Sequence, residues 1–224
     1  IQYRLDQTES TVEARNELID TLRKQIDFLH AHIDFLHEHL TEVRIGNQVW
    51  MTQNLNVDKF RNGDPIPEVK SDWDWYEAGR KGQPAWCYLN NDPANGDKYG
   101  KLYNWYAVKD PRGLAPDGWH IPNDPEWQTL LSNLGENAST KMKRIKGWDE
   151  GRCSNESGFS GTPGSWRGSN GPFDKEGCMG AWWSFTSDIS ASFGNVVYLD
   201  CWHSDPIWDQ FGDIVGLSVR CLKD

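Results

Sequence analysis

The sequence predicts two parts of different fold class, a long helical coiled coil over residues 1–44 and an α+β head over residues 45–224. Hydrophobic residues recur in heptads through the first part, which contains no Pro or Gly. The second part is rich in Gly, Trp, Tyr, Asn and Pro and shows few helical periods. That composition is typical of short strands joined by long loops. We therefore expect one globular head carried on a helical stalk.

The heptad pattern of residues 1–44 is sustained over nearly six repeats, with Thr8 and Arg15 as polar exceptions at d positions. A helix of this length is about 60 Å long at about 1.5 Å per residue. A lone helix cannot bury such a stripe, so we expect it to self-associate. The a positions are Leu5, Val12, Ile19, Ile26, Ile33 and Leu40, and the apolar d positions are Ile1, Leu22, Leu29, Leu36 and Val43.

The sequence contains conflicting indications of how many helices associate in the stalk. Ile at a with Leu at d favours a dimer. Phe28 and Phe35 at c positions widen the apolar seam, which favours three helices, so we expect a parallel homotrimer. Histidines at e and g positions also flank the seam, and they are explained either by packing or by a metal or pH-sensing site, with packing favoured. These histidines are His30, His32, His37 and His39.

Residues 124–134 carry the clearest helix signal of the head. Asp124 is placed to cap the helix, Pro125 suits its first turn and Gly135 suits its end. A second, shorter helix is expected between Lys101 and Val108. The buried face of the first helix is expected to consist of Trp127, Leu130, Leu131 and Leu134.

Charge and cysteine spacing exclude several classes of function. The net charge of −10 disfavours nucleic-acid binding, which needs a basic surface. No run of eighteen apolar residues occurs, so no membrane span is expected. None of the five cysteines is spaced as C-x-x-C, which argues against a zinc knuckle or a thioredoxin-type site. Disulfide pairing and redox compartment stay open at this point.

The stretch between Trp182–Thr186 and Gly216–Cys221 has an unusual composition. Aromatic residues are set among Asp, Gly, Ser, Asn and Pro. Rigid rings with small polar neighbours are typical of a binding surface, because rings give contact area at low entropic cost. The alternative is an irregular β-rich end of the domain with the aromatic residues inside.

Several motifs, in the right order, resemble the Fibrobacter succinogenes major paralogous domain over nearly all of residues 45–224. They are Ile45-Gly-Asn-Gln-Val-Trp-Met-Thr-Gln-Asn-Leu55, Tyr99-Gly-Lys-Leu-Tyr-Asn-Trp-Tyr-Ala107, Gly118-Trp-His-Ile-Pro122 with Glu126-Trp127, Ser157-Gly-Phe-Ser-Gly-Thr-Pro-Gly164, Trp182-Trp-Ser184 and Gly216-Leu-Ser-Val-Arg-Cys221. Two positions depart from the family pattern, where Phe185 replaces a small Ser and Leu217 replaces Phe. Both are packing changes that leave the expected fold intact.

The resemblance implies a C-type-lectin-like fold of the formylglycine-generating-enzyme branch. It also implies a likeness to the variable proteins of diversity-generating retroelements, in which substitutions concentrate just before the C-terminus. Trp182–Thr186 and Gly216–Cys221 would then be a fixed frame, with Trp202 and Trp208 as anchors of a ligand-binding surface. The expected ligand-binding residues are Asp188, Ser192, Phe193, Asn195, Asp200, Trp202, His203, Ser204, Asp205, Ile207, Trp208, Asp209, Phe211 and Asp213.

We expect no enzymatic activity. The enzymes of the related branch bind copper through a pair of nearby C-terminal cysteines, whereas Cys201 and Cys221 lie twenty positions apart. His120, at the start of the predicted helix, is more easily explained as structural than as catalytic. Calcium is retained as an alternative to no cofactor, because Asn90–Asp92 and Asn95–Asp97 are rich in oxygen ligands.

The expected function is that of a ligand-displaying receptor-binding or adhesion protein. Its partners would be two further copies through residues 1–44 and a surface protein or glycan receptor on a cell. Its place would be extracellular, on a phage virion tail or a bacterial cell surface. The alternatives are a structural fibre-tip or pilus module and, less favoured, an enzyme of the formylglycine-generating type.

Overall fold

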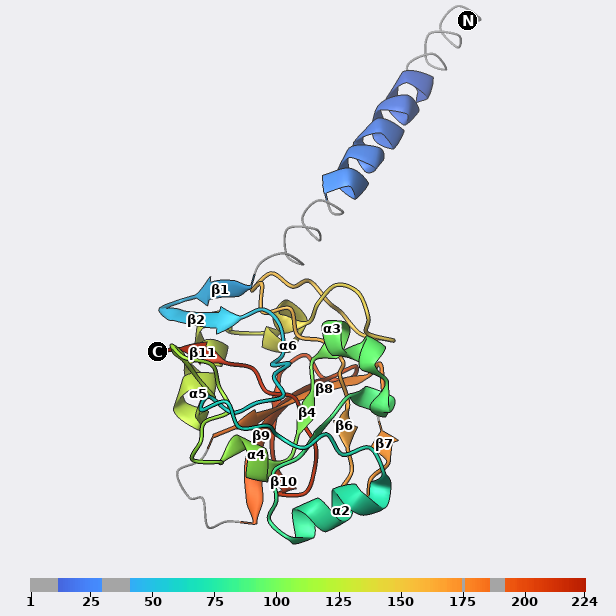
Figure 1. Cartoon of the computed structure of the whole chain (residues 1–224). Coiled ribbons are helices and arrows are strands. Elements are labelled where there is room, and N and C mark those ends of the chain that lie inside the picture. The colour runs from blue at the N-terminus through green and yellow to red at the C-terminus, as the bar shows by residue number, and fades with distance from the viewer. Residues whose placement is uncertain (1–11, 30–40, 175, 186–191) are drawn as a thin grey trace, which may run out of the picture. The chain divides into compact units, whose positions relative to one another are not determined.

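The computed structural model describes residues 12–29, 41–174, 176–185 and 192–224. The chain divides into two compact units, Ile1–Leu40 and Thr41–Asp224. The second unit contains helices and several small antiparallel sheets, as expected for an α+β head (Figure 1).

Residues 12–29 of the first unit form an α-helix. The predicted stalk is longer, and its remaining residues 1–11 and 30–40, including the four histidines, lie outside the described residues. Of the five aliphatic a and d side chains within the helix, Ile19 is half-buried and the other four are exposed in the single chain. Their exposed fractions are 55% for Val12, 47% for Leu22, 50% for Ile26 and 55% for Leu29.

The boundary between the two units differs from the expected one. Residues 42–44, which the heptads assigned to the stalk, lie instead in strand β1 (Glu42–Ile45) of the head. Val43 packs against the core of the head rather than continuing a helical seam. The reason is that β1 and β2 (Gln48–Met51) form an antiparallel hairpin around the Gly46-Asn47 turn.

The head is built from short elements with long connections (Figure 1). Its helices are α2 (Asp72–Arg80), η1 (Leu89–Asn91), η2 (Pro93–Asn95), α3 (Gly96–Tyr99), α4 (Trp105–Val108), α5 (Asp124–Leu134) and α6 (Ala138–Met142). Its further strands are β3 (Trp86–Cys87), β4 (Leu102–Tyr103), β5 (Trp119–His120), β6 (Trp166–Arg167), β7 (Phe173–Asp174), β8 (Met179–Ser184), β9 (Phe193–Asp200), β10 (Ile207–Gly212) and β11 (Leu222–Lys223).

Two sheets organise the head. A four-stranded sheet in the order β1-β2-β11-β5 joins the first strands of the head to its last strand. A three-stranded sheet in the order β10-β9-β8 carries the C-terminal half, with β9 paired antiparallel to both neighbours. Two further pairs, β3-β4 and β6-β7, complete the described strands. The frame residues Trp182–Ser184 and the predicted surface thus belong to one sheet, in which the end strand β8 is buried and the other end strand, β10, is partly exposed.

Strand β8 lies at the centre of the core. Its adjacent residues Trp182 and Trp183 point to opposite faces, as alternation along a strand requires, and both are fully buried. Trp182 packs with Trp127 and Phe159 in one cluster, whereas Trp183 packs in the other cluster. Because both faces are covered, a change in β8 disturbs the whole head.

Helix α5 confirms the prediction for residues 124–134. Asn123, rather than Asp124, is the cap, and it forms a capping box with Glu126. Gly135 ends the helix with a φ of 62°. Trp127 and Leu130 are buried.

The prediction of a helix over residues 101–108 was partly wrong. Leu102–Tyr103 form strand β4 against β3, and only Trp105–Val108 are helical. The Asn104 side chain accepts a hydrogen bond from the Ala107 N–H and so caps a helix that starts later.

Over residues 12–29, 41–174, 176–185 and 192–224, no helix is long and apolar enough to cross a membrane.

Candidate ligand-binding surface

The predicted surface lies on the hairpin formed by β9 and β10. In this hairpin Trp208 faces Val197 and Asp209 faces Val196. Few large hydrophobic side chains are exposed in the described part of the head, and three of them belong to this hairpin and its turn. The exposed fractions are 55% for Phe193, 62% for Trp202 and 38% for Trp208, and the other two exposed side chains are Trp73 and Ile145. Aromatic exposure is therefore concentrated at the predicted position.

The predicted site residues fall into four groups by burial. The exposed ones are Ser192, Phe193, Trp202, His203, Ser204, Asp205, Trp208 and Asp209. The half-buried ones are Asn195, Ile207, Phe211 and Asp213. Asp200 is buried, and Asp188 lies outside the described residues. The hairpin therefore brings most of the set together, but not all of its side chains face solvent.

Asp200 holds the turn that follows β9. Its carboxylate accepts hydrogen bonds from the Trp202 N–H at 3.0 Å and the His203 N–H at 2.8 Å. The His203 Nδ1 atom lies 2.7 Å from the Asp200 Oδ2 atom. Burial raises the pKa of Asp200, but the hydrogen bonds from His203 and Trp202 outweigh this effect and lower it below the usual value. Asp200 thus positions the turn instead of offering a free carboxylate to a ligand.

The same turn is tied to the rest of the head at three further points. A disulfide joins Cys178, at the start of β8, to Cys201. The buried Lys143 ammonium donates to the Asp200 carbonyl, and the Ser139 N–H donates to the Ser204 carbonyl at 2.9 Å. Trp202 and its neighbours are therefore displayed from a restrained backbone, which reduces the entropy lost on binding.

A polar chain connects helix α5 to the hairpin. The Asp124 carboxylate accepts from Ser184 at 2.5 Å and from the Asn195 amide at 2.6 Å. Asn195 in turn accepts from the Gln210 amide at 2.9 Å. Gln210 is exposed on β10 and is a surface residue that sequence reasoning missed. Its position between Trp208 and Gly212 on an alternating strand was the signal that could have identified it.

Two predicted residues of β10 and its continuation contact the core. Phe211 packs on Trp166 with ring centroids 4.7 Å apart. Asp213 accepts a hydrogen bond of 2.5 Å from the Tyr106 hydroxyl. Burial and this carboxylate raise the pKa of Tyr106 to about 12. Phe211 and Asp213 therefore anchor one end of the hairpin.

The alternative catalytic and metal residues have structural partners. His120 lies between two carboxylates, with Nδ1 at 2.7 Å from Asp224 and Nε2 at 3.0 Å from Glu126. It thereby joins the capping box of α5 to the C-terminal end. Cys201 is in the disulfide, while Cys221 is a buried free thiol. In the described ranges, no group of three or more His, Cys, Asp or Glu side chains could hold a metal ion.

The oxygen-rich run considered for calcium belongs to the short helices η1, η2 and α3. Asn90 and Asn91 have φ angles of 55° and 56°, and the Asp92 side chain accepts from the Ala94 N–H. The Asn90 and Asn95 amides donate to Glu176 and to the Leu89 carbonyl. These contacts account for the composition of the run without a cation.

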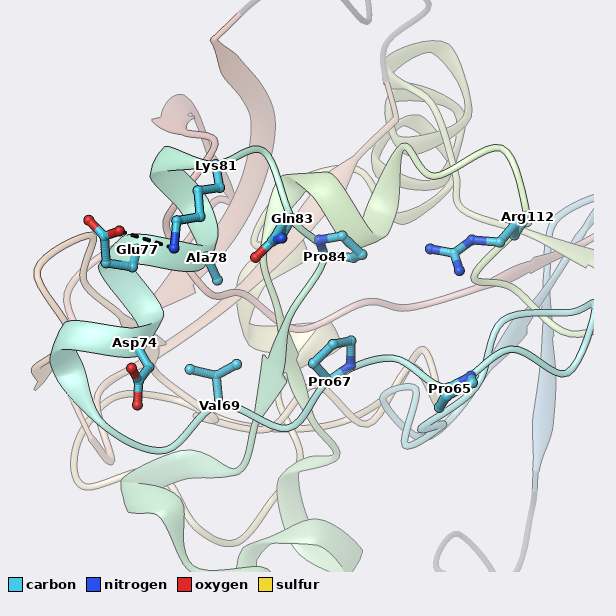
Figure 2. A pocket seen from close by; sticks show the side chains of 10 residues that line it. All are labelled: Pro65, Pro67, Val69, Asp74, Glu77, Ala78, Lys81, Gln83, Pro84 and Arg112. Carbon is cyan, nitrogen blue, oxygen red and sulfur yellow. Dashed lines mark ion pairs between the residues drawn. The ribbon is translucent and has the colours of Figure 1, made fainter.

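A pocket of about 430 Å³ lies beside α2, and no residue of the hairpin lines it (Figure 2). Its charged side chains already have partners. Glu77 pairs with Lys81 at 3.3 Å and with Arg80 at 2.8 Å, and Arg112 pairs with Asp64 and Asp110. Prolines and small apolar residues make up much of the remaining lining, and none of the predicted site residues contributes. The lining residues are Pro65, Pro67, Val69, Asp74, Glu77, Ala78, Lys81, Gln83, Pro84 and Arg112.

Comparison with known proteins gives one match. The family model described as Fibrobacter succinogenes major domain (Fib_succ_major) matches residues 43–223. No significant match is found among curated proteins or among solved structures. The match includes the frame strand β8, the hairpin and the closing segment Gly216–Cys221.

Proposed function

Because the chain belongs to the Fibrobacter succinogenes major domain family, we propose that it is a ligand-displaying receptor-binding or adhesion protein. Its head is a C-type-lectin-like domain of the formylglycine-generating-enzyme branch. It has the scaffold of that branch but lacks the nearby pair of cysteines that binds copper in those enzymes. Its ligand is a surface protein or a glycan receptor on a cell. The exposed residues of the β9–β10 hairpin and its turn make the binding surface.

One observation carries this proposal: exposed aromatic side chains are displayed from a buried, cross-linked frame. Trp202 and Trp208 are exposed by 62% and 38%, whereas Trp182 and Trp183 on β8 of the same sheet are fully buried. Exposed tryptophan on a rigid backbone is costly in water and typical of binding hot spots. A module that only capped a fibre would have no need of rings at this position.

The proposed place of action is extracellular, on a phage virion tail or a bacterial cell surface. The Cys178–Cys201 disulfide supports it, because disulfides persist mainly in oxidising environments. The proposed stalk over residues 1–40 is a parallel homotrimer, supported by the exposed aliphatic stripe of the helix over residues 12–29. Trimerisation multiplies the binding of weak heads without new contacts.

The test uses the full chain in a screen against glycans and cell-surface proteins. Trp202→Ala and Trp208→Ala are expected to abolish binding to the partners found, while the thermal unfolding midpoint stays close to that of the original chain. Trp73→Ala is the matched control, because Trp73 is 68% exposed on α2. Retained binding in both hairpin variants, or equal loss in the control, would leave the structural fibre-tip or pilus module as the better explanation.

The retroelement relationship has its own test in the nucleotide sequence. Diversification predicts a second, template copy of the segment that encodes residues 186–215, in which the codons of the exposed hairpin positions are rich in adenine. Differences between the copies should fall on exposed positions such as Trp202 and Trp208 and spare Trp182 and Trp183. Uniform differences across frame and surface would contradict this relationship.

A further inference from the structure

The outer edge of β10 is open for pairing. β10 is the last strand of the β10-β9-β8 sheet, and within the described parts of the chain no strand pairs with its other side. The Gln210 N–H donates to the Asp209 carboxylate at 2.8 Å, so it points away from β9. Because backbone groups alternate along an antiparallel strand, those of Trp208 point the same way. A strand of six residues thus offers a template for another strand.

The charge around this edge is negative. The chain carries 23 Lys and Arg residues in 224, about one in ten, but none occurs between Lys175 and Arg220. Asp205 and Asp209 are exposed, and neither forms an ion pair with any residue that the structure describes. Asp209 accepts one backbone N–H, from Gln210, whereas Asp200 accepts two backbone N–H groups and also contacts the His203 ring. Asp209 on β10 and Asp205 just before it therefore present carboxylates without a cationic partner among the described residues.

Apolar surface lies next to these carboxylates. Ile207 faces the half-buried Tyr198 across the hairpin, and Asp209 lies diagonally from Tyr198 on the same face. Burial, followed by the Asp209 carboxylate, raises the pKa of Tyr198, which reflects this proximity. Trp208 projects from the opposite face of β10. The stem of a lysine or arginine can pack on such rings while its charged end meets a carboxylate.

We propose that the partner of this surface is an extended, basic polypeptide segment that pairs with β10 as a fourth strand of the sheet. This inference rests on the proposed function and specifies the chemistry of the receptor. Main-chain hydrogen bonds to the edge of β10 supply affinity, and alternate side chains supply specificity. Lysine or arginine at alternate positions meets Asp209 on one face, and apolar side chains meet Trp208 on the other.

A second copy of this chain is a poor occupant of the same edge. Two β10 strands in contact would bring Asp209 of each copy together, and no lysine or arginine occurs in β10 to offset these charges, which destabilise pairing across strands. Outward carboxylates on an edge strand are a usual protection against self-association. The same carboxylates select for a partner of opposite charge.

The experiment uses the full chain and a short fluorescent peptide that alternates lysine with valine. The peptide is expected to bind, and binding should weaken at least tenfold between about 50 mM and about 500 mM sodium chloride, because salt screens exposed charges. The double variant Asp205→Asn/Asp209→Asn is expected to bind about threefold to tenfold more weakly. Asp97→Asn, which removes one carboxylate at an exposed position of α3, should have no effect.

Two peptide controls separate strand pairing from simple charge attraction. A peptide that alternates glutamate with valine should not bind. A lysine–valine peptide N-methylated at every second residue keeps its charge but loses backbone donors, and it should bind at least tenfold more weakly. Equal binding of the methylated peptide, equal binding of the glutamate peptide, or equal weakening by Asp97→Asn would overturn the inference.

The failure of this inference is distinguishable from the failure of the proposed function. If screened partners lose binding in Trp202→Ala and Trp208→Ala but the lysine–valine peptide does not bind, the surface binds a ligand of another class. That result overturns only the inference that the partner is a basic, extended segment. If those partners bind both tryptophan variants normally, the proposed function itself is overturned, whatever the peptide does.

Discussion

The Asp200 carboxylate and the His203 imidazole lie within 2.7 Å of each other, and the same carboxylate accepts the His203 N–H at 2.8 Å. This pair turns the chain sharply at the end of β9, just before the exposed Trp202 is reached. Asp200 is buried while His203 is largely exposed, so the contact joins the core to the proposed binding surface. The shape of that proposed surface therefore depends on a buried carboxylate.

Asp200→Ala is expected to lower the free energy of unfolding by about 1–3 kcal/mol, because two backbone N–H groups lose their acceptor. The folded-state pKa of Asp200 is lowered, so its stabilisation is present above the unfolded-state pKa of about 3.9 and is lost as the pH falls through the folded-state value. The difference in melting temperature from the original chain should be constant above about pH 5 and shrink in acid.

Thermal unfolding at several pH values checks this expectation. Asp205→Ala is the control, because Asp205 is exposed and forms no ion pair with any described residue. Its effect should stay within about 0.5 kcal/mol. If the two variants unfold alike, Asp200 does not hold the turn.

Tyr106→Phe is expected to destabilise the head at neutral pH, because the hydrogen bond from Tyr106 to Asp213 is lost. The pKa of Tyr106 is raised from about 10 in an unfolded chain to about 12. A raised folded-state pKa means that the stabilisation is complete below about pH 10 and is lost as the pH rises through about 12. Melting curves of both chains should therefore converge in strong alkali. A difference that grows with alkali would contradict the assigned hydrogen bond.

Reduction of the Cys178–Cys201 disulfide is expected to lower stability by about 2–4 kcal/mol, the usual effect of closing a loop of moderate length. The bridged residues are 23 positions apart and enclose both β8 and β9. Binding should also weaken, because the turn with Trp202 loses a restraint. Cys178→Ser should reproduce both effects, whereas Cys153→Ser, at a free and half-buried thiol, should have neither. Unchanged melting of reduced protein would argue against this pairing.

Local sequence patterns predicted the elements of the head whose structure depends on residues adjacent in sequence. Helix α5 was predicted because its cap, its proline and Gly135 all lie within the helix or next to it. The frame was expected from the resemblance to the family and not from a local pattern, and its residues Trp182–Ser184 lie in a continuous buried strand.

Contacts between distant residues were beyond such patterns. The Asp124 contact with Asn195 spans 71 positions, and the Tyr106 contact with Asp213 spans 107. Nothing near Asn195 or Asp213 in the sequence distinguishes them from residues that face a ligand. For the same reason, residues 101–103 were expected in a helix, although pairing with β3 places Leu102–Tyr103 in a strand. Tertiary contacts override local helical preference there.

The stalk is expected to sediment as a trimer and to depend on its apolar seam. Leu22→Asp, at a d position, should dissociate the chain into monomers, because three buried carboxylates would repel one another. Lys24→Asp, two residues away on the opposite face of the same helix, should leave the trimer intact. Analytical ultracentrifugation of the full chain measures both. A dimer would change the proposed strand number, and a monomeric original chain would contradict the stalk.

Two glycines of the binding hairpin should respond in opposite ways to the same substitution. A Cβ atom on Gly194 would lie 2.6 Å from the Trp183 ring and 2.8 Å from the Trp105 ring, closer than packed atoms approach. Gly194→Ala must displace these buried rings, and we expect a loss of about 1–3 kcal/mol in the free energy of unfolding.

Gly212 lies near Gly194 at the same end of the hairpin, but a Cβ atom there would meet nothing within 4 Å. Its φ angle is outside the left-handed region, so alanine fits its backbone. Gly212→Ala is therefore expected to change stability by less than about 0.5 kcal/mol, or to raise it slightly through the unfolded chain. Urea unfolding measures the stability of both variants. It compares a position packed against tryptophan, Gly194, with a position that has no neighbouring atoms, Gly212. Equal losses in both variants would mean that the end of the hairpin is packed on both sides and presents no open surface to a ligand.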